Sequence, residues 1–101
     1  MTKNKAIDIS VMSTLTQINL KAIIVFVFVV ETKSLLGASL VLGYSLPNIS
    51  IHLKHLRDVI KTPLFTREGR CLLPTEYAIV LCEKFKHCLT GLYEVIKDET
   101  P

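Results

Sequence analysis

The amino-acid sequence predicts a mainly α-helical domain with one short β-hairpin, and three observations lead to this prediction. Apolar residues recur at helical spacing in the middle of the chain and again, with a period of 3.5 residues, in its last quarter. Between these segments, a Glu-Gly pair separates two short apolar runs, as in two strands joined by a turn. The 101 residues suffice for one domain with a modest core.

The composition indicates a folded protein in a reducing compartment. Half of the residues are apolar and 21% are charged, which favours a packed core over disorder. The three cysteines are an odd number and form no CxxC pair, so they do not predict a disulfide scaffold: Cys71, Cys82 and Cys88. We therefore expect the protein in the cytoplasm.

Charge is distributed unevenly along the chain, whose formal net charge is +3. Residues 50–73 contain five basic and two acidic side chains, a local charge of +3. Residues 74–101 contain three basic and five acidic side chains, a local charge of −2. A basic middle segment suggests a surface for a polyanion, and ordinary solvated charge is the alternative.

The run Ala22–Val30 consists of nine apolar residues. A membrane span needs about 20 such residues, and Glu31 and Lys33 end the run well before that length. A signal peptide is opposed by Asp8, by Glu31 and by the lack of a small-residue cleavage site. We therefore expect a helix from Leu20 to about Glu31, no membrane association, and a loosely structured extension over residues 1–18, which show no clear period.

Two further helices are expected before the hairpin. Ser34 is a suitable N-cap for a short helix that closes at Gly43 and carries three apolar residues: Leu36, Leu40 and Val41. After the turn at Gly43-Tyr44, Ser45 can cap a second helix with Pro47 in its first turn.

The second of these helices has the clearest periodicity in the chain. Five apolar residues at spacings of 3, 4, 3 and 4 predict a stripe that faces the core: Leu46, Ile49, Leu53, Leu56 and Ile60. The opposite face carries Pro47, Ile51, Lys54 and Asp58. Two helices joined by a short glycine-containing turn, the second polar and basic on its outer face, are typical of a helix-turn-helix.

The remaining segment predicts a hairpin and a long final helix. Leu64–Thr66 and Cys71–Leu73 flank the Glu68-Gly69 turn, Pro74 ends the hairpin, and Thr75 can cap the helix. In that helix, residues at spacings of 4, 3, 4, 3 and 4 predict a seam that packs along another helix, and we expect dimerisation through it: Ala78, Cys82, Phe85, Leu89, Leu92 and Ile96.

From about Asn19 to Ala78, the order of several short motifs resembles the N-terminal domain of LysR-type transcriptional regulators. The motifs are Asn19-Leu-Lys, the Phe26–Thr32 run ending Val-Glu-Thr-x-Ser, Ala38, Leu42-Gly43, Ser45-x-Pro47, Ser50, Leu56, Pro63-Leu-Phe, Arg67, Gly69-Arg70 and Pro74-Thr-Glu. The resemblance implies a winged helix-turn-helix over residues 19–74, with residues 64–74 as the wing. It also implies a linker helix within residues 75–101, through which such proteins dimerise, and a first helix buried between this linker helix and the helix-turn-helix.

The resemblance implies double-stranded DNA as the partner, with the recognition helix at about residues 45–60 in the major groove. On the helix, Asn48, Ser50 and Ile51 are expected to face base edges, while Lys54, His55 and Arg57 face phosphate. The full set expected at DNA is Ser45, Pro47, Asn48, Ser50, Ile51, Lys54, His55, Arg57, Thr66, Arg67 and Arg70. A dimer would present two recognition helices, which predicts an inverted repeat of half-sites.

The chain departs from the family pattern in two respects. Such proteins normally continue into an effector-binding domain, whereas this sequence ends at Pro101, either as a naturally short regulator or as one domain of a longer protein. We expect no small-molecule effector for the chain as given. The family commonly has Gln or another polar residue at position 46 and often Arg at position 51, where this chain has Leu46 and Ile51.

These departures keep two functions open. The first is a homodimeric, nucleoid-associated DNA-binding regulator. The second is an interaction protein that pairs through its last helix with a full-length LysR-type relative, as a heterodimer, and binds DNA weakly itself. No enzyme is expected, because no nucleophile–base pair or phosphate-binding loop is present, and no cofactor is expected. His52 and His55 lie at i, i+3 but lack further ligands at a convincing spacing, so no metal site is expected either.

Overall fold

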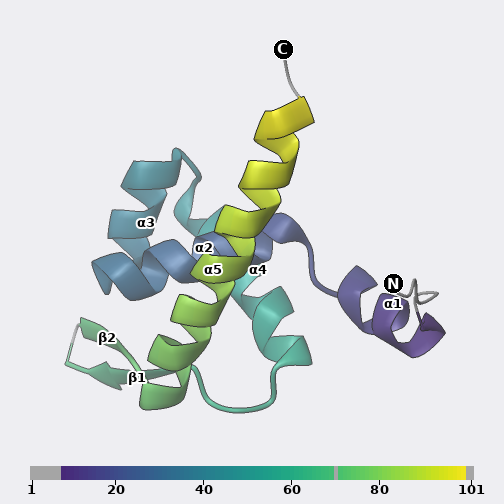
Figure 1. Ribbon diagram of the computed structural model, residues 1–101. Coiled ribbons are helices and arrows are strands. Elements are labelled where there is room, and N and C mark those ends of the chain that lie inside the picture. Colours follow the sequence, from purple (N-terminus) through teal and green to yellow (C-terminus); the bar gives the residue numbers. More distant parts are fainter. Residues whose placement is uncertain (1–7, 70, 100–101) are drawn as a thin grey trace.

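The structure is a computed structural model that describes residues 8–69 and 71–99. Its elements follow in the order α1 (Ile9–Thr16), α2 (Leu20–Thr32), α3 (Leu35–Leu42), α4 (Leu46–Val59), β1 (Phe65–Glu68), β2 (Cys71–Pro74) and α5 (Glu76–Glu99). In Figure 1, α2 lies at the centre, α5 crosses over it, and α1 stands apart from the rest. The described part of the chain is thus mainly helical with one hairpin, as the sequence predicts.

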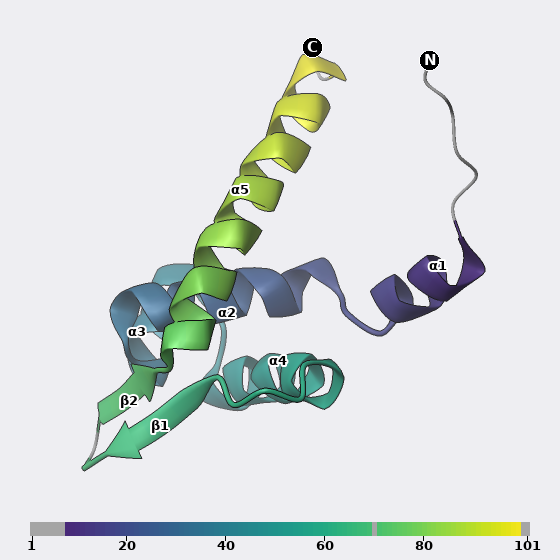
Figure 2. The same ribbon diagram turned by 60° about the horizontal axis from the view of Figure 1, so that its bottom comes forward.

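Helix α2 is the centre of the core. The Asn19 side chain accepts a hydrogen bond from the Ala22 N–H at 2.7 Å and starts the helix, while Lys33 ends it in a left-handed conformation with φ 56°. Six of its side chains are buried: Ala22, Val25, Phe26, Val27, Val29 and Val30. Because α3 and α4 pack on one side of α2 and α5 packs on another (Figure 2), burial on both sides is confirmed and outweighs its strand-like composition.

Helix α3 has the predicted ends. The Ser34 hydroxyl accepts a hydrogen bond from the Gly37 N–H at 2.9 Å, and Gly43 closes the helix at φ 75°. A Cβ on Gly37 would lie 2.8 Å from the Thr32 Cβ, so this glycine lets α3 start directly against the end of α2. The core side of α3 is formed by Leu35, Ala38 and Leu42, while the three predicted apolar residues are exposed: Leu36, Leu40 and Val41.

Helix α4 confirms most of the predicted stripe. Its N-cap is Ser45, which accepts a hydrogen bond from the Asn48 N–H at 3.3 Å. Ile49, Leu53 and Leu56 are buried, and Ile60 packs against them from the C-cap. The prediction was wrong for Leu46, which is 43% exposed. Leu46 is the first helical residue, so the helix has only begun at this point and the core side is reached one turn later, at Ile49.

Strands β1 and β2 form the predicted antiparallel hairpin, shifted by one residue. Glu68 pairs with Cys71 and therefore belongs to β1, while Gly69 takes a positive φ of 61° at the turn. The expected turn residue Arg70 lies outside the described residues. Leu64 precedes β1 and is buried in the core, which attaches the base of the hairpin to the helices.

Helix α5 extends beyond the body of the domain, as both views show. The Thr75 hydroxyl caps it by accepting a hydrogen bond from the Ala78 N–H at 3.1 Å, as predicted. We call residues 76–89 the inner half of α5 and residues 90–99 the outer half. Side chains of the inner half pack on α2, whereas all residues of the outer half are exposed.

Helix α1 was not predicted, since a loose segment was expected over residues 1–18. Asp8 caps it by accepting hydrogen bonds from the Ser10 N–H at 2.9 Å and the Ser10 hydroxyl at 3.0 Å, which lowers the pKa of Asp8. None of its residues is buried. Among the described residues, no single helix is long and apolar enough to cross a membrane, although α1 and α2 together, bent by 60°, pass on length and composition.

Candidate nucleic-acid interface

The outer face of α4 presents the polar and basic residues that the sequence assigned to it. Asn48, Ser50 and Lys54 are exposed, and Ile51 is 53% exposed in their midst. Ser45, Pro47, His55 and Arg57 are exposed as well. Eight of the expected contact residues therefore lie on one accessible helix and its N-cap.

Few intramolecular bonds restrain the basic groups of this face. Lys54 Nζ lies 3.3 Å from Asp58 Oδ2 on the next helical turn, with side chains that are 66% and 59% exposed. Such exposed i, i+4 pairs contribute about 0.3–0.5 kcal/mol. A phosphate oxygen can therefore replace the carboxylate at small cost, so the pair keeps Lys54 ordered without blocking its use.

His52 lies on the flank of α4 beside the helix-turn-helix turn. Its ring centroid is 6.2 Å from that of Tyr44 and 6.3 Å from that of His55. Burial lowers the pKa of His52, and the neighbouring His55 and Lys21 side chains lower it further. These surroundings favour the neutral form of His52, which lies beside Tyr44, whereas His55 is exposed.

A cleft of about 160 Å³ joins α4 to the wing. Ser50 and Arg57 line it from α4, and Arg67 lines it from β1, over an apolar floor formed by Leu53, Phe65 and Leu72. Two guanidinium groups from residues ten positions apart in sequence thus border one concave surface together with a hydroxyl. Arginine pairs with phosphate through two parallel hydrogen bonds, so this arrangement is suited to a polyanion backbone.

A second hollow, of about 480 Å³, lies between the start of α3 and the wing. Arg67 borders it too, together with Cys71, Leu46 and Lys33. The sequence analysis did not place Lys33 at the interface. Lys33 ends α2, and it comes near the wing only in the folded chain.

The remaining expected wing residue, Thr66, is exposed on β1 and pairs with Leu73.

The outer face of α3 adds an apolar surface that the sequence did not predict. Leu36, Leu40 and Val41 are 55%, 74% and 59% exposed, and Leu36 shares the second hollow with Leu46. Basic groups thus border an apolar surface on this side of the molecule.

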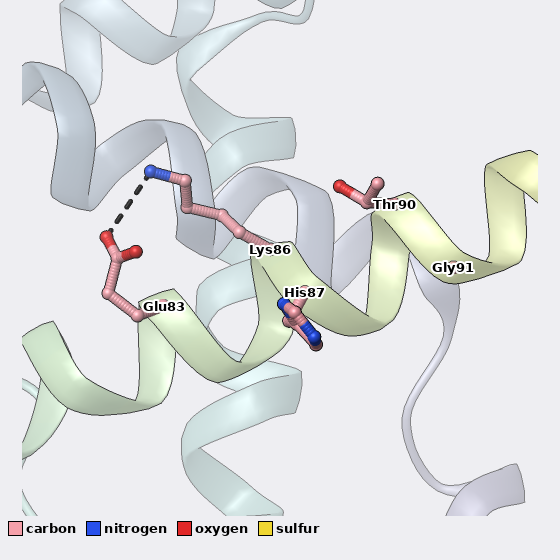
Figure 3. A pocket seen from close by; sticks show the side chains of 5 residues that line it. All are labelled: Glu83, Lys86, His87, Thr90 and Gly91. Carbon is pink, nitrogen blue, oxygen red and sulfur yellow. Dashed lines mark hydrogen bonds and ion pairs between the residues drawn. The ribbon is translucent and has the colours of Figure 1, made fainter.

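The inner half of α5 is fixed to α2 by a polar contact beside the core. Lys86 Nζ lies 3.1 Å from Glu31 Oε2 and 3.3 Å from Glu83 Oε2, and these hydrogen bonds raise the pKa of Lys86. Figure 3 shows Lys86 and Glu83 reaching toward each other, beside a hollow that extends to Gly91.

Burial, and then the charge of Glu31, raise the pKa of Cys82, so this thiol stays protonated. No group of three or more potential metal ligands occurs within residues 8–69 and 71–99.

The six residues of the expected dimer seam have different surroundings. Ala78 and Cys82 are buried within the chain's own core, and Phe85 packs edge-on against Phe26 with ring centroids 5.9 Å apart. Leu89 packs against the same core. Only Leu92 and Ile96 are largely exposed, at 42% and 53%.

Comparisons with known proteins identify this architecture. The family model described as "Bacterial regulatory helix-turn-helix protein, lysR family" matches residues 20–79. The HTH-type transcriptional activator NagR of Ralstonia sp is 35% identical over 78 residues, which are 77% of this chain and 26% of NagR. This chain therefore corresponds to about a quarter of that relative's length.

Solved structures agree on the fold. A probable transcriptional regulator from Pseudomonas aeruginosa, PA0477, superposes with a TM-score of 0.75 at 26% identity, over 88% of this chain and 30% of that one. The DNA-binding domain of BenM, solved in complex with the benA site 1 DNA, superposes with a TM-score of 0.73 at 21% identity, over 79% of this chain and 90% of that one. With its winged helix-turn-helix fold and this family match over residues 20–79, the chain belongs to the LysR family of bacterial DNA-binding transcription regulators.

Proposed function

We propose that the protein binds double-stranded DNA, with α4 in the major groove and the wing on the sugar-phosphate backbone. The observation that carries this proposal is the cleft where Ser50, Arg57 and Arg67 meet. Asn48, Ser50 and Ile51 face the base edges, with the Ile51 side chain against a thymine methyl group. Lys33, Lys54 and Arg67 contact phosphate, which would make binding strongly dependent on salt.

The DNA-bound form is a homodimer joined along α5. The exposed outer half of α5 supports this, because Leu92 and Ile96 continue the apolar seam beyond the domain's own core. Two copies related by a two-fold axis present two α4 helices, so the target is an interrupted inverted repeat. Such a protein acts on chromosomal DNA, in the cytoplasm.

A salt titration of DNA binding tests this function. Purified protein is titrated onto the DNA upstream of its own coding sequence and onto an unrelated fragment of equal length, at several salt concentrations. We expect tighter binding to the first fragment and a steep loss of affinity with salt. Arg67→Ala should lower the slope of log affinity against log salt by about 1, whereas Lys84→Ala on α5, remote from the cleft, should leave it unchanged. A folded protein that bound neither fragment at low salt would contradict the proposal.

The apolar surface around α3 favours a second candidate function. Leu36, Leu46 and Ile51 are each 43–55% exposed on the side that would face DNA, where polar groups are usual. On this alternative, α5 pairs with the linker helix of a full-length LysR-type regulator and alters its DNA binding. The same titration separates the two: a protein that fails to bind DNA alone but weakens binding by a co-expressed relative would be of this second kind.

A further inference from the structure

Helix α1 lies outside the segment matched by the family model and has no role in the domain's core. Ile9, Val11, Met12 and Leu15 are 82%, 48%, 41% and 55% exposed. At 100° per residue they fall on one side of the helix, opposite Ser10, Ser13 and Thr14. The helix is therefore amphipathic, and its apolar side faces solvent in the single chain.

An isolated helix of this length is not stable by itself. Helices shorter than about 12–15 residues are marginal in water even with favourable sequences. The Asp8 cap helps, but Ser and Thr residues in the helix interior do not, and the Thr14 and Thr16 hydroxyls bond back to the Ser10 and Ser13 carbonyls. A partner that covers the apolar side would supply the missing stability.

The outer half of α5 offers a matching surface. Leu92, Tyr93 and Val95 are 42%, 60% and 63% exposed, beyond the point where α2 covers the helix. Gly91 lies beside them, and a Cβ added there would meet nothing within 4 Å. Glycine inside a helix costs about 1 kcal/mol relative to alanine, and nothing in the described part of the chain explains it, whereas close approach by another helix would.

We propose that, in the homodimer, α1 of each copy packs against the outer half of α5 of the other copy and so clasps the dimer. This proposal rests on the homodimer put forward above. A two-fold axis makes the contact occur twice, once for each α1. The occupant is thus a second copy of this chain.

The interface area argues for this occupant. A stable interface buries about 800 Å² on each partner. The outer half of α5 presents four partly exposed large apolar side chains: Leu92, Tyr93, Val95 and Ile96. Helix α1 presents four more, so its burial would double the number of apolar side chains that these two segments bring to the interface. Burial of α1 would therefore bring the dimer interface closer to the standard size.

Charge fits the same arrangement. Residues 9–16 carry no charged side chain, so α1 has no cation to pair with DNA phosphate. The segment Glu94–Glu99 contains three acidic residues and one lysine, and residues 1–8 contain two lysines and one aspartate. A basic N-terminal segment thus precedes α1 in sequence, and an acidic segment ends α5.

The first test measures dimer affinity by analytical ultracentrifugation. Met12→Gln/Leu15→Gln places two amides on the apolar side of α1, and Ser13→Gln places the same amide on the polar side as a matched control. We expect the double variant to raise the dimer Kd by about tenfold or more, with the control unchanged. Equal dimer affinity in all three proteins would overturn the clasp while leaving the homodimer intact. A wild-type protein that stayed monomeric would instead overturn the homodimer, and the clasp with it.

The second test locates α1 by cross-linking in a Cys71→Ser/Cys88→Ser background, which removes the exposed thiols. One chain carries Leu15→Cys and a differently sized chain carries Val95→Cys, and a bis-maleimide is added to the mixture. We expect a covalent heterodimer, and far less of it when Ser13→Cys replaces Leu15→Cys. A chain that carries both cysteines and cross-links only within itself would overturn the proposal. So would flotation of wild-type protein with anionic lipid vesicles that the double variant loses, because α1 would then bind membrane.

Discussion

The inner and outer halves of α5 share one apolar repeat but differ in what surrounds it. In the inner half, Ala78 and Cys82 are buried against α2 at 0% and 1% exposure. In the outer half, Leu92 occupies the next position of the same seam and is 42% exposed. A heptad pattern therefore identifies the side of a helix that will be covered. It does not identify whether the cover comes from the same chain or from another one.

The largest effect on stability is expected from Phe26→Ala, which removes the α2 ring that packs against the inner half of α5. Phe26 is fully buried and meets Phe65 and Phe85 edge-on, each with ring centroids 5.9 Å apart. Truncating such a side chain costs about 3–5 kcal/mol, through lost burial and the cavity left behind. Urea unfolding followed by circular dichroism should show this loss in the free energy of unfolding. A loss below about 1 kcal/mol would show that the inner half does not depend on α2.

Leu92→Gln/Val95→Gln tests the outer half. Because both side chains are exposed in the single chain, the free energy of unfolding at concentrations where the protein is monomeric should change by less than about 0.5 kcal/mol. The dimer Kd should rise by at least about tenfold, since two apolar contacts are lost in each copy. Sedimentation equilibrium measures the second quantity. If unfolding were affected instead, the two halves of α5 would not differ in the way described.

Gly91→Ala sharpens the boundary between the halves. In the single chain the new methyl group meets nothing within 4 Å, so helix propensity alone should stabilise the monomer by about 1 kcal/mol. If a partner helix approaches Gly91 closely, the same change should weaken the dimer. Thermal unfolding at low concentration and sedimentation at high concentration separate these effects. Tighter dimerisation by the variant would place Gly91 outside the interface.

The smallest expected effect on stability is the pH dependence that arises from Cys82. This cysteine is buried in the inner half of α5, whereas Cys88, near the end of the same half, is exposed. Cys88 is exposed and should react with a maleimide in the native protein, whereas Cys82 should react only after unfolding. Because burial raises the pKa of Cys82, the unfolded chain loses this proton first as the pH rises. Stability should therefore decline above the ordinary thiol pKa of 9.0, and less so in Cys82→Ala. Equal labelling of Cys82 and Cys88 at pH 7 would contradict the burial of Cys82.

Local signals in the sequence predicted the helix ends and the hairpin. Ser34, Ser45 and Thr75 act as caps because a hydroxyl three residues before an unsatisfied N–H needs no distant partner. The exposure of Leu46 and of the outer face of α3 could not be predicted, since it depends on how far neighbouring helices extend. Helix α1 was missed because eight residues with an uncharged, mixed pattern give little periodic signal.

The candidate site was predictable residue by residue but not as an arrangement. Exposed polar positions on α4 follow from the same period that buries Ile49 and Leu53. That Arg57 and Arg67 border one cleft depends on where the hairpin lies relative to α4, which no local pattern encodes. Lys33 was overlooked for the same reason, because it approaches the wing only in three dimensions.

Thr75 connects the β-hairpin to α5. Its hydroxyl donates to the Pro63 carbonyl at 2.9 Å and accepts from the Ala78 N–H, while its own N–H donates to the Leu64 carbonyl at 3.0 Å. One residue thus fastens both ends of the hairpin to the first turn of α5. In the proposed dimer, a change in the tilt of α5 would therefore move the wing relative to the bound DNA. The rigidity of the Thr75 contacts would then determine which half-site spacings the dimer can bind.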